Sequence, residues 1–528
     1  MTAKLWFLIP EFILFGAAVI VSVLGLSRSR LLRDLSPFIA IVALIAAAIA
    51  TPLVYSDEAR LAEARLLMPL LGQYVKIVVC AVGALLALLS IGMVDRGLEA
   101  AFASGRAPFD PIRVARGEYW SFFLLSLIGV MLITSANDLI WLFLALELTS
   151  LPTYVMVATA RSRRKSSEAA IKYFFLGAMA AAMFLFGFAL IYGATGTIVL
   201  TEVRNAFAYQ IVYSDGGISA IGIMGIILAL LGICFKIAAA PMHFYAADVY
   251  EGAPGPVTAF LAFSPKTAGM ITFIMLLSTV IVPEQIGQAV VFPPTITAAL
   301  FMISVLTMTL GNVLAMLQRS VKRILAYSSI AHSGYMLIGV IAGPGAGFNS
   351  VLFYLLAYGV MNTAAFAVLA ALERQGEEMD SLDDLAGLGR KHPGMAAVMA
   401  IAALSLLGFP PLLGFVGKFY LFAAGIEAGQ VALVVIACVN SAISAWYYLK
   451  LAGLPILAAP PPAADSITRV PSYWPRFAAL LAAAAVATLW IVAQPISNLA
   501  GETMDGEMLG TADVPERMGL IADSGAVR

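Results

Sequence analysis

Long apolar segments separated by short polar loops follow one another along the whole chain. Most of these segments have about the 20 residues that a helix needs to cross the hydrocarbon core of a bilayer. The pattern therefore predicts an all-α polytopic membrane protein with about 14 transmembrane helices. The predicted spans are residues 5–26, 36–55, 75–94, 118–136, 138–160, 171–193, 217–247, 255–282, 294–317, 321–342, 347–373, 394–427, 430–452 and 474–498.

The seventh and twelfth segments, 217–247 and 394–427, are the longest and contain prolines, so we expect discontinuous helices there. Because they are an odd number of spans apart, they cross in opposite directions. That layout is typical of inverted repeats, whose ion sites lie near the middle of the membrane. We therefore predict two inverted five-helix repeats. The chain then divides into helices 1–3 (1–117), a first repeat of helices 4–8 (118–282), a second, inverted repeat of helices 9–13 (283–452), and helix 14 with a polar C-terminal tail (453–528).

Composition supports a membrane protein and gives its orientation. The chain is 61% hydrophobic and only 12% charged, whereas soluble domains carry about 25% charged residues. Its net charge is zero, which offers no electrostatic footprint for nucleic acid. Placing the amino terminus outside puts most of the 31 lysines and arginines in loops on the cytoplasmic side, as the positive-inside rule requires. Both termini are then expected on the outer face.

Two lysines lie in apolar segments close to prolines. Lys236 precedes Pro241, and Lys266 directly follows Pro265. A charge at bilayer depth costs roughly 3 kcal/mol on insertion scales, so intramembrane lysines usually carry function. A helix-interior proline leaves the carbonyl four residues back, here that of Ile237, without its usual donor. Such open backbone persists at membrane depth only inside protein or a wet cavity. Two lysines beside two helix breaks predict an ion path, although snorkelling lysines and packing kinks would give the same pattern.

Four further ionisable residues are candidates for the same path. Lys418 follows the Pro410-Pro411 pair, and Glu147 lies in the middle of an apolar span. We expect Lys418 to face the protein interior, joined to the other lysines by a polar chain through His332 or water; the alternative is a lysine snorkelling at the outer surface. The alternative for Glu147 is a carboxyl group that burial keeps neutral. The alternative for His332 is a core histidine whose hydrogen bonds are satisfied and which has no part in the path. Lys172, near a cytoplasmic helix end, either takes part in the path or snorkels.

Other polar features are weaker signals. Glu11 is expected near the outer surface, and Asp248 and Glu251 are expected to be solvated residues of a turn. The three cysteines form no CxxC pair, which speaks against an iron–sulfur cluster or a zinc site. The run Gly387-Leu-Gly389 lacks the third glycine of a dinucleotide-binding motif. The sequence therefore predicts no redox active site and no metal site in this chain.

Four motifs resemble the antiporter-like membrane subunits of proton-pumping NADH:quinone oxidoreductase (complex I). They are FKIAAAPMHFYAADVYEGAPGPVTAFLAFSPKTAG (235–269), LALELTSLPTYVMVA (144–158), KRILAYSSIAHSGYMLIG (322–339) and GFPPLLGFVGKFYLF (408–422). The resemblance covers roughly residues 118–452. The DVYEGAP run and Lys418 are similar to the N type of these subunits, because the M type usually has a glutamate in place of that lysine. The chain departs from the family at PMHFYAADVY, where relatives usually have PFHxWxPDVY.

The resemblance implies a function and a set of partners. Glu147 would pair with Lys236, and Lys266 and Lys418 would carry the proton onward; from their positions we add His332 and Lys172 to this proton relay. Burial favours a neutral lysine and a nearby carboxylate a charged one, so making or breaking the pair would switch Lys236 between proton acceptor and donor. The chain would act as a translocase subunit that binds no cofactor itself. We expect the partner subunits to bind NADH, FMN, iron–sulfur clusters and quinone. This chain would contact other membrane subunits of complex I and lipids. It would lie in a bacterial inner membrane with both termini on the periplasmic side.

Two alternatives stay open at this point. One is a subunit of a multisubunit Na⁺/H⁺ antiporter of the same fold. The other is a purely structural membrane scaffold or a quinone-binding anchor, for which three buried lysines would be hard to justify.

Overall fold

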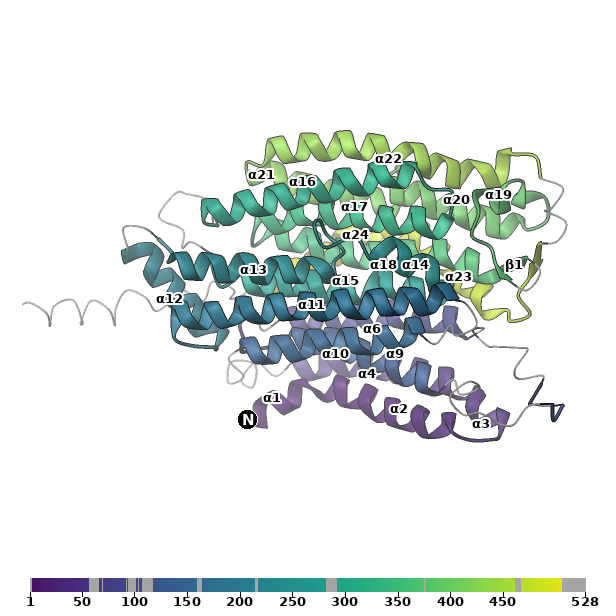
Figure 1. Cartoon of the computed structure of the whole chain (residues 1–528), viewed down its shortest axis with the longest axis horizontal. Helices are drawn as coiled ribbons and strands as arrows, with labels where there is room; N and C mark the ends of the chain where they lie inside the picture. Colours follow the sequence, from purple (N-terminus) through teal and green to yellow (C-terminus); the bar gives the residue numbers. More distant parts are fainter. Residues whose placement is uncertain are drawn as a thin grey trace, which may run out of the picture.

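Helices run side by side along the long axis of the molecule and form one bundle (Figure 1). This is a computed structural model of the chain. It describes residues 2–56, 66–68, 70–91, 93, 101–102, 104–106, 117–158, 164–213, 217–281, 292–374, 377–460 and 467–505. All statements below refer to these residues.

Helices account for nearly all of the regular structure. The helices of the first half are α1 (Thr2–Phe7), α2 (Ile9–Gly25), α3 (Arg30–Asp34), α4 (Ser36–Tyr55), α6 (Leu71–Ser90), α9 (Gly117–Ile133), α10 (Leu139–Ala158), α11 (Arg164–Thr195), α12 (Leu200–Tyr213), α13 (Ala220–Lys236), α14 (Ala246–Gly252) and α15 (Gly255–Leu277). Those of the second half are α16 (Pro294–Met316), α17 (Val321–Ala342), α18 (Ala346–Ala371), α19 (Leu382–Leu385), α20 (Pro393–Leu407), α21 (Leu413–Glu427), α22 (Val431–Leu457), α23 (Trp474–Thr488) and α24 (Ala493–Asp505), with short 3-10 turns η1 (Leu388–Arg390) and η3 (Leu489–Val492).

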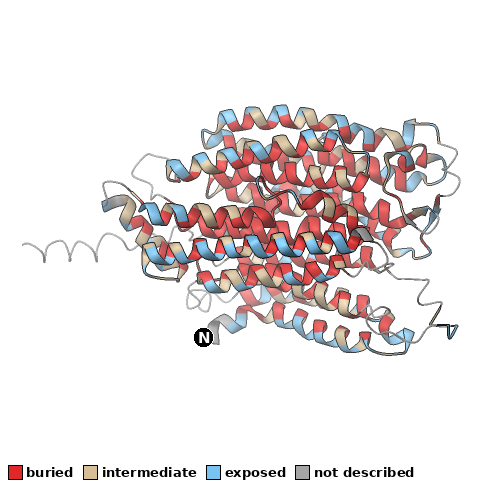
Figure 2. Ribbon diagram, viewed as in Figure 1, coloured by how far each residue is buried: buried red, intermediate tan, exposed pale blue. Residues whose placement is uncertain are grey.

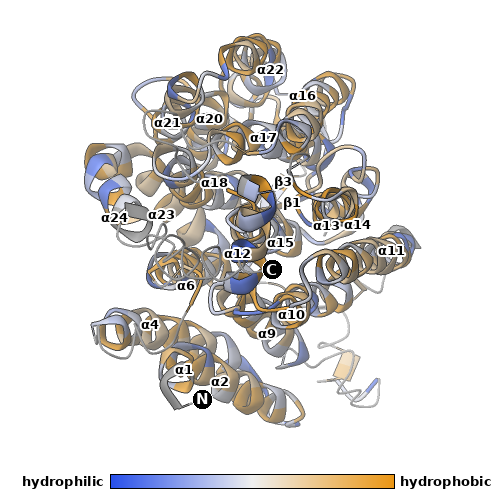
Figure 3. Ribbon diagram, turned by 90° about the vertical axis from the view of Figure 1, so that its left-hand side faces the viewer, coloured by the Kyte–Doolittle hydropathy of each residue, from blue (hydrophilic) through white to orange (hydrophobic). Residues whose placement is uncertain are grey.

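The predicted class, an all-α membrane protein, is confirmed. Ten of the described helices are long and apolar enough to cross a membrane, and four shorter ones are also apolar. Seen end-on, the peripheral helices carry apolar residues on their outward faces as well as inside (Figure 3). Exposed side chains such as Phe15, Ile45 and Val435 belong to this outer surface. An outer surface of this kind suits lipid and not water.

The centre of the bundle is formed by α15, α17 and α18, and Figure 2 shows the buried interior in red. Between 94% and 100% of the apolar stretch of these three helices is buried, against 39% for the peripheral α11 and α22. A helix that is apolar all round must be enclosed by other helices. Lys266 lies on α15 and His332 on α17, so these two candidate residues occupy the most enclosed part of the molecule.

The predicted interruptions in segments 217–247 and 394–427 are confirmed. α13 ends at Lys236 and helix resumes at Ala246; α20 ends at Leu407 and α21 begins at Leu413. The break expected at Pro265 is wrong, because α15 continues through this proline. Every residue of α15 is buried, and neighbouring helices that enclose a membrane helix on all sides let it keep its course despite one missing hydrogen bond.

A small antiparallel sheet, which the sequence pattern did not predict, follows α18 at one end of the bundle (Figure 1). Its strands are β1 (Leu372–Arg374), β2 (Glu377–Glu378) and β3 (Ile467–Arg469), in the order β2-β1-β3. Strands of two or three residues are too short for an alternating pattern to be visible in the sequence.

Candidate functional site

The first pair of charges joins α10 to the end of α13. Lys236 is the last residue of α13, and its ammonium lies 2.9 Å from Glu147 Oε1 and 2.7 Å from Ser150 Oγ, both on α10. The Lys236 side chain is 1% exposed and that of Glu147 17%. Because the last carbonyls of a helix carry partial negative charge, the end of α13 also stabilises a cation here. Glu147 and Lys236 are thus in direct contact, as the resemblance implied.

The unwound segment after α13 is held by side chains from other helices. The carbonyl of Ile237, which Pro241 deprives of its helical donor, accepts a hydrogen bond of 2.5 Å from the Ser333 hydroxyl of α17. The backbone N–H of Ala240 donates to Thr307 Oγ1 of α16 at 3.0 Å. The open backbone therefore lies inside protein, which is the condition for such backbone at membrane depth.

α15 comes close to this break at Gly269. A Cβ atom on Gly269 would lie 2.4 Å from Ile237 Cγ2 and 3.1 Å from Lys236 Cβ, so only glycine fits. Lys236 and Lys266 both line a cavity of about 10 Å³, which is about the space that the centre of one water molecule needs. Its other walls include Tyr173, Tyr245, Tyr250, Leu261 and Pro265. The two lysines are thus separated by room for one polar bridge.

Lys266 forms no ion pair with any carboxylate in the described part of the chain. Its ammonium donates to the backbone carbonyl of Ser329 on α17 and, at 2.7 Å, to the Ser329 hydroxyl. The Tyr358 ring centre lies 4.5 Å from Nζ, within the range of a cation–π interaction. Dipoles and an aromatic face therefore hold this lysine, where a counter-charge holds Lys236.

His332 has a hydroxyl partner on each ring nitrogen. Nδ1 lies 2.6 Å from the Tyr354 hydroxyl on α18, and Nε2 lies 2.8 Å from the Tyr448 hydroxyl on α22. Tyr448 is also 2.5 Å from Ser328 Oγ. Sequence reasoning missed both tyrosines, because a tyrosine in an apolar helix looks like any core aromatic until the fold shows what its hydroxyl meets.

Lys418 lies near the start of α21 and is bonded to the interruption before it. Its Nζ donates to the carbonyl of Leu407, the last residue of α20, at 2.8 Å and to Ser441 Oγ at 3.2 Å. Pro411 lacks the N–H that would otherwise reach that carbonyl, so the lysine supplies the missing donor. Gly408 has φ +92°, and a Cβ there would lie 3.0 Å from Lys418 Cδ, so this turn also requires glycine. With 5% exposure, the predicted interior position of Lys418 is confirmed.

Glu147, Lys236, Lys266, His332 and Lys418 form a row of ionisable residues inside the bundle, and Lys172 lies apart from this row. Its side chain is 41% exposed and pairs with Glu168 at 2.7 Å and with Asp248 at 2.8 Å. Asp248 and Glu251 each also pair with Arg323 of α17 at 2.9 Å, so the expectation of solvated turn residues is wrong. Burial alone would raise the pKa of Asp248, but the hydrogen bonds from Lys172 and Arg323 outweigh it and hold the pKa below its usual value.

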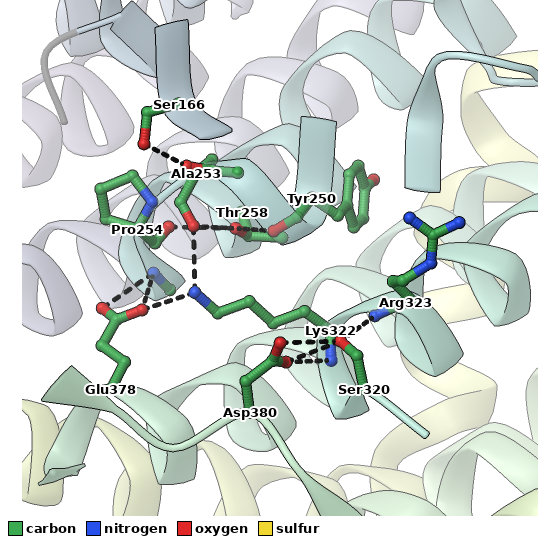
Figure 4. A network of polar contacts seen from close by, with 12 residues as sticks. Ser166, Tyr250, Ala253, Pro254, Thr258, Ser320, Lys322, Arg323, Glu378 and Asp380 are labelled. Atoms are coloured by element: carbon green, nitrogen blue, oxygen red, sulfur yellow. Dashed lines mark hydrogen bonds and ion pairs between the residues drawn. The ribbon is translucent and has the colours of Figure 1, made fainter. Parts of the chain in front are cut away.

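Next to this cluster, Lys322 at the start of α17 is enclosed between the turn before α15 and the β1–β2 hairpin (Figure 4). Its Nζ donates to the carbonyl of Ala253 at 3.0 Å and pairs with Glu378 at 2.6 Å. Glu378 also accepts from the backbone N–H of Gly255 at 3.0 Å, and Asp380 accepts from the Lys322 N–H at 3.0 Å. The sequence predicts no role for Lys322; the structure shows that it ties the beginnings of α15 and α17 together.

A second buried ion pair lies outside the row, among the N-terminal helices. Lys76 of α6 lies 2.8 Å from Glu11 of α2 and donates at 2.6 Å to the carbonyl of Phe7, the last residue of α1. The two side chains are 0% and 4% exposed. The expected position of Glu11 near the outer surface of the membrane stays a prediction, but its side chain is enclosed by protein. The end of α1 favours a cation and the first turn of α2 an anion, which suits this pair. Only the folded arrangement brings these two helix ends together.

The described residues offer little to a metal. No group of three or more His, Cys, Asp or Glu side chains among them could hold a metal ion. Cys80 and Cys234 are buried far from each other in the sequence, and Cys438 is exposed. The polar atoms of the site are instead arranged around ammonium groups and one imidazole.

Comparison with known proteins places this arrangement in a class. A family described as NADH:quinone oxidoreductase/Mrp antiporter, transmembrane, matches residues 136–444, which include the whole row from Glu147 to Lys418. NADH-quinone oxidoreductase subunit N of Rhodospirillum rubrum is 43% identical over 336 residues, 64% of this chain and 66% of that protein. The subunit of the same name from Methylobacterium nodulans is 39% identical over 415 residues, 77% of this chain and 80% of that protein.

Among solved structures, a chain of respiratory complex I from Thermus thermophilus with bound aureothin has the same fold. It is 30% identical with a TM-score of 0.71, and the match covers 93% of this chain and 100% of that one. The chain therefore belongs to the NADH:quinone oxidoreductase/Mrp antiporter transmembrane family, and within it to the relatives named NADH-quinone oxidoreductase subunit N. The alignment with the Rhodospirillum relative spans just under two thirds of that relative's length.

Proposed function

We propose that this chain translocates protons as the N-type membrane subunit of a NADH:quinone oxidoreductase. The relay consists of Glu147, Lys236, Lys266, His332 and Lys418, with Lys172 at its exposed end. The observation that carries the proposal is the contact of Lys236 with Glu147 and Ser150 beside an unwound helix. A buried lysine with a counter-charge on one side, and on the other a small cavity that a second lysine also lines, has two groups with which to exchange its proton.

The first transfer follows from this geometry. While Glu147 is 2.9 Å from Lys236, the carboxylate stabilises the ammonium. When the pair separates, an N–H bond of the Lys236 ammonium breaks as its proton passes to a water in the cavity, and that water gives a proton to the neutral amine of Lys266, where a new N–H bond forms. These groups titrate as a coupled set, since each charge changes the free energy of placing the next.

The finer architecture is part of the proposal. We infer about fourteen crossings with both termini periplasmic in a bacterial inner membrane, and two inverted repeats within the proposed divisions 1–117, 118–282, 283–452 and 453–528. Support comes from the two interruptions, because Lys236 precedes the first and Lys418 follows the second. Position 283, where the second repeat would start, lies outside the described residues.

The energy must come from partners. Moving one charge against the membrane potential costs about 2.3 kcal/mol per 100 mV. We infer that NADH, FMN, iron–sulfur clusters and quinone are bound by other subunits of the complex, and that this chain contacts other membrane subunits and lipids and binds no nucleic acid.

Sodium transport, the activity of antiporters in the same family, is the less favoured function. Sodium needs a set of free oxygen ligands in the membrane interior. Here the Ser329 carbonyl and hydroxyl are occupied by Lys266, and the Leu407 carbonyl by Lys418. An arrangement in which ammonium groups fill the oxygen positions favours protons as the transported ion.

The test uses membranes that contain the assembled complex with Glu147→Gln or Lys236→Arg. Glu147→Gln should lower NADH-driven proton pumping and NADH oxidation together, by about tenfold or more, which is a modest share of what a positioned acid–base group contributes. Lys236→Arg should lower proton pumping and NADH oxidation to the same extent, because a guanidinium group does not release its proton in proteins.

The matched control is Glu427→Gln, since Glu427 is an exposed carboxylate at the end of α21 and should leave pumping near normal. An assembled Glu147→Gln complex with full pumping, or full rescue by Lys236→Arg, would show that the pair is a fixed structural contact. Dependence of the pumping on sodium ions would replace the proton proposal by the antiporter alternative.

A further inference from the structure

The imidazole of His332 does not face either neighbouring lysine through a nitrogen. Its Nδ1 and Nε2 are bonded to the hydroxyls of Tyr354 and Tyr448 at 2.6 and 2.8 Å. His332 is 1% exposed, so no bulk water competes for these positions. A proton that enters or leaves the ring must therefore pass through one of the two tyrosine hydroxyls.

Two further aromatic rings each lie near the imidazole and near one of the lysines. The Tyr358 ring centre is 4.5 Å from Lys266 Nζ and 5.1 Å from the His332 ring centre. The Tyr335 ring centre is 5.0 Å from Lys418 Nζ and 5.7 Å from the His332 ring centre. The face of an aromatic ring carries no exchangeable hydrogen, so these contacts stabilise the ammonium groups but are not steps of a proton relay.

The hydroxyl route leads around these rings. Tyr448 lies 2.5 Å from Ser328 Oγ, and Ser328 is the neighbour in sequence of Ser329, which holds the Lys266 ammonium. At the other end, a Cβ on Gly417 would lie 2.6 Å from the Tyr354 ring atom Cδ2, and Gly417 precedes Lys418. The hydrogen-bonded groups thus run from Ser328, one residue before the partner of Lys266, to Tyr354, whose ring packs against the backbone one residue before Lys418. One water at each end would complete the path to the two lysines.

We propose that Ser328, Tyr448, His332 and Tyr354 form the proton wire between Lys266 and Lys418, with the two tyrosines as proton-relaying residues. The proposal rests on the proton relay described above and names the groups that complete its middle section. In a neutral imidazole one nitrogen donates and the other accepts. One tyrosine hydroxyl therefore donates to the ring while the other accepts from it, which is the ordered state that a relay requires.

One passage balances as follows when Nδ1 carries the hydrogen. The O–H bond of Tyr448 breaks as an N–H bond forms at Nε2, and Tyr448 takes the hydroxyl proton of Ser328, which a water protonated by Lys266 replaces. The N–H bond at Nδ1 breaks as an O–H bond forms on Tyr354, whose original proton passes through a water to the neutral amine of Lys418. One proton has moved from Lys266 to Lys418, no group of the wire keeps a net charge, and the imidazole is left with its hydrogen on Nε2.

The test compares Tyr448→Phe and Tyr354→Phe with Tyr119→Phe in membranes containing the assembled complex. Tyr119 of α9 is also buried, and its hydroxyl donates to Ser90 Oγ at 2.9 Å, away from His332. We expect the first two variants to lose about tenfold or more of NADH-driven pumping and to show a larger solvent deuterium isotope effect on turnover. Tyr119→Phe should keep both near the unmodified values.

A structural role would not change the isotope effect, and it would not be rescued by Tyr448→His, which returns a group able to relay protons. If Tyr448→Phe impairs assembly on native gels, Tyr354→Phe tests the same wire at its other end. Normal pumping in both phenylalanine variants, with Lys266→Met inactive, would overturn the wire and leave the proposed function standing. Normal pumping in Lys266→Met as well would overturn the proposed function itself.

Discussion

The buried pair of Lys76 and Glu11 gives a quantitative test of how the N-terminal helices are held. Replacing one partner leaves the other charge buried and uncompensated, which in buried ion pairs costs about 3–5 kcal/mol. Glu11→Gln should cost this much, because the Lys76 ammonium, which is 0% exposed, loses its counter-charge and keeps neutral partners such as the Phe7 carbonyl at 2.6 Å and the Tyr55 ring. Lys76→Met should cost at least as much, because it strands the carboxylate and also leaves that carbonyl without its donor.

The double variant Glu11→Leu with Lys76→Met distinguishes the attraction between the two charges from the cost of burying one charge alone. Replacing both members of a buried pair by apolar residues is often neutral. Here the Phe7 carbonyl still loses its donor, and an unsatisfied buried acceptor costs about 1–3 kcal/mol. We therefore expect the double variant to be less damaging than either single one, with a remaining loss of about 1–3 kcal/mol.

The assay is thermal release of the chain from the detergent-purified complex, followed on native gels for the single and double variants. Asp34→Asn is the control, since the Arg30–Asp34 pair is 3.5 Å apart and its side chains are 70% and 39% exposed. Exposed pairs contribute about 0–1 kcal/mol, so this change should hardly shift the midpoint. If the double variant lost the sum of the two single effects, the side chains would act independently and the reasoning from their contact would fail.

Two predictions concern the second half of the bundle. Lys418→Met should lose most NADH-driven pumping in an assembled complex, because a thioether cannot carry a proton, whereas Lys418→Glu should keep part of it; full activity of the methionine variant would remove Lys418 from the path. Glu378→Gln should weaken the contact that joins Lys322 to the turn before α15 and speed hydrogen exchange of the Gly255 amide, which donates to Glu378. Unchanged exchange would show that the backbone at this turn is held without Glu378.

The sequence predicted the helices and both interruptions because these depend on local features. An apolar run of about 20 residues and a proline act on the backbone where they stand. The limit of this logic is visible at Pro265, where enclosure by neighbouring helices keeps α15 continuous. The same proline chemistry opens the chain at Pro241, where the carbonyl of Ile237 finds a hydroxyl donor in Ser333.

The parts that were missed depend on contacts between distant segments. Lys76 and Glu11 lie on separate helices, and the residues around each of them in the sequence do not predict that the two form an ion pair. Tyr354 and Tyr448 meet His332 from α18 and α22, although each resembles an ordinary core aromatic in its own segment. The β1–β2 hairpin is too short to show a pattern, and yet its Glu378 reaches Lys322.

The position of α17 explains how one movement can reach the whole site. His332 and Ser333 lie three and four residues after Ser329, so all three are on the same side of this helix. Through them α17 contacts Lys266, the tyrosine hydroxyls and the unwound carbonyl of Ile237. Packed helices shift between discrete arrangements and do not deform continuously. A shift of α17 would therefore change the backbone beside Lys236, the oxygen ligands of Lys266 and the hydroxyl partners of His332 in a single step.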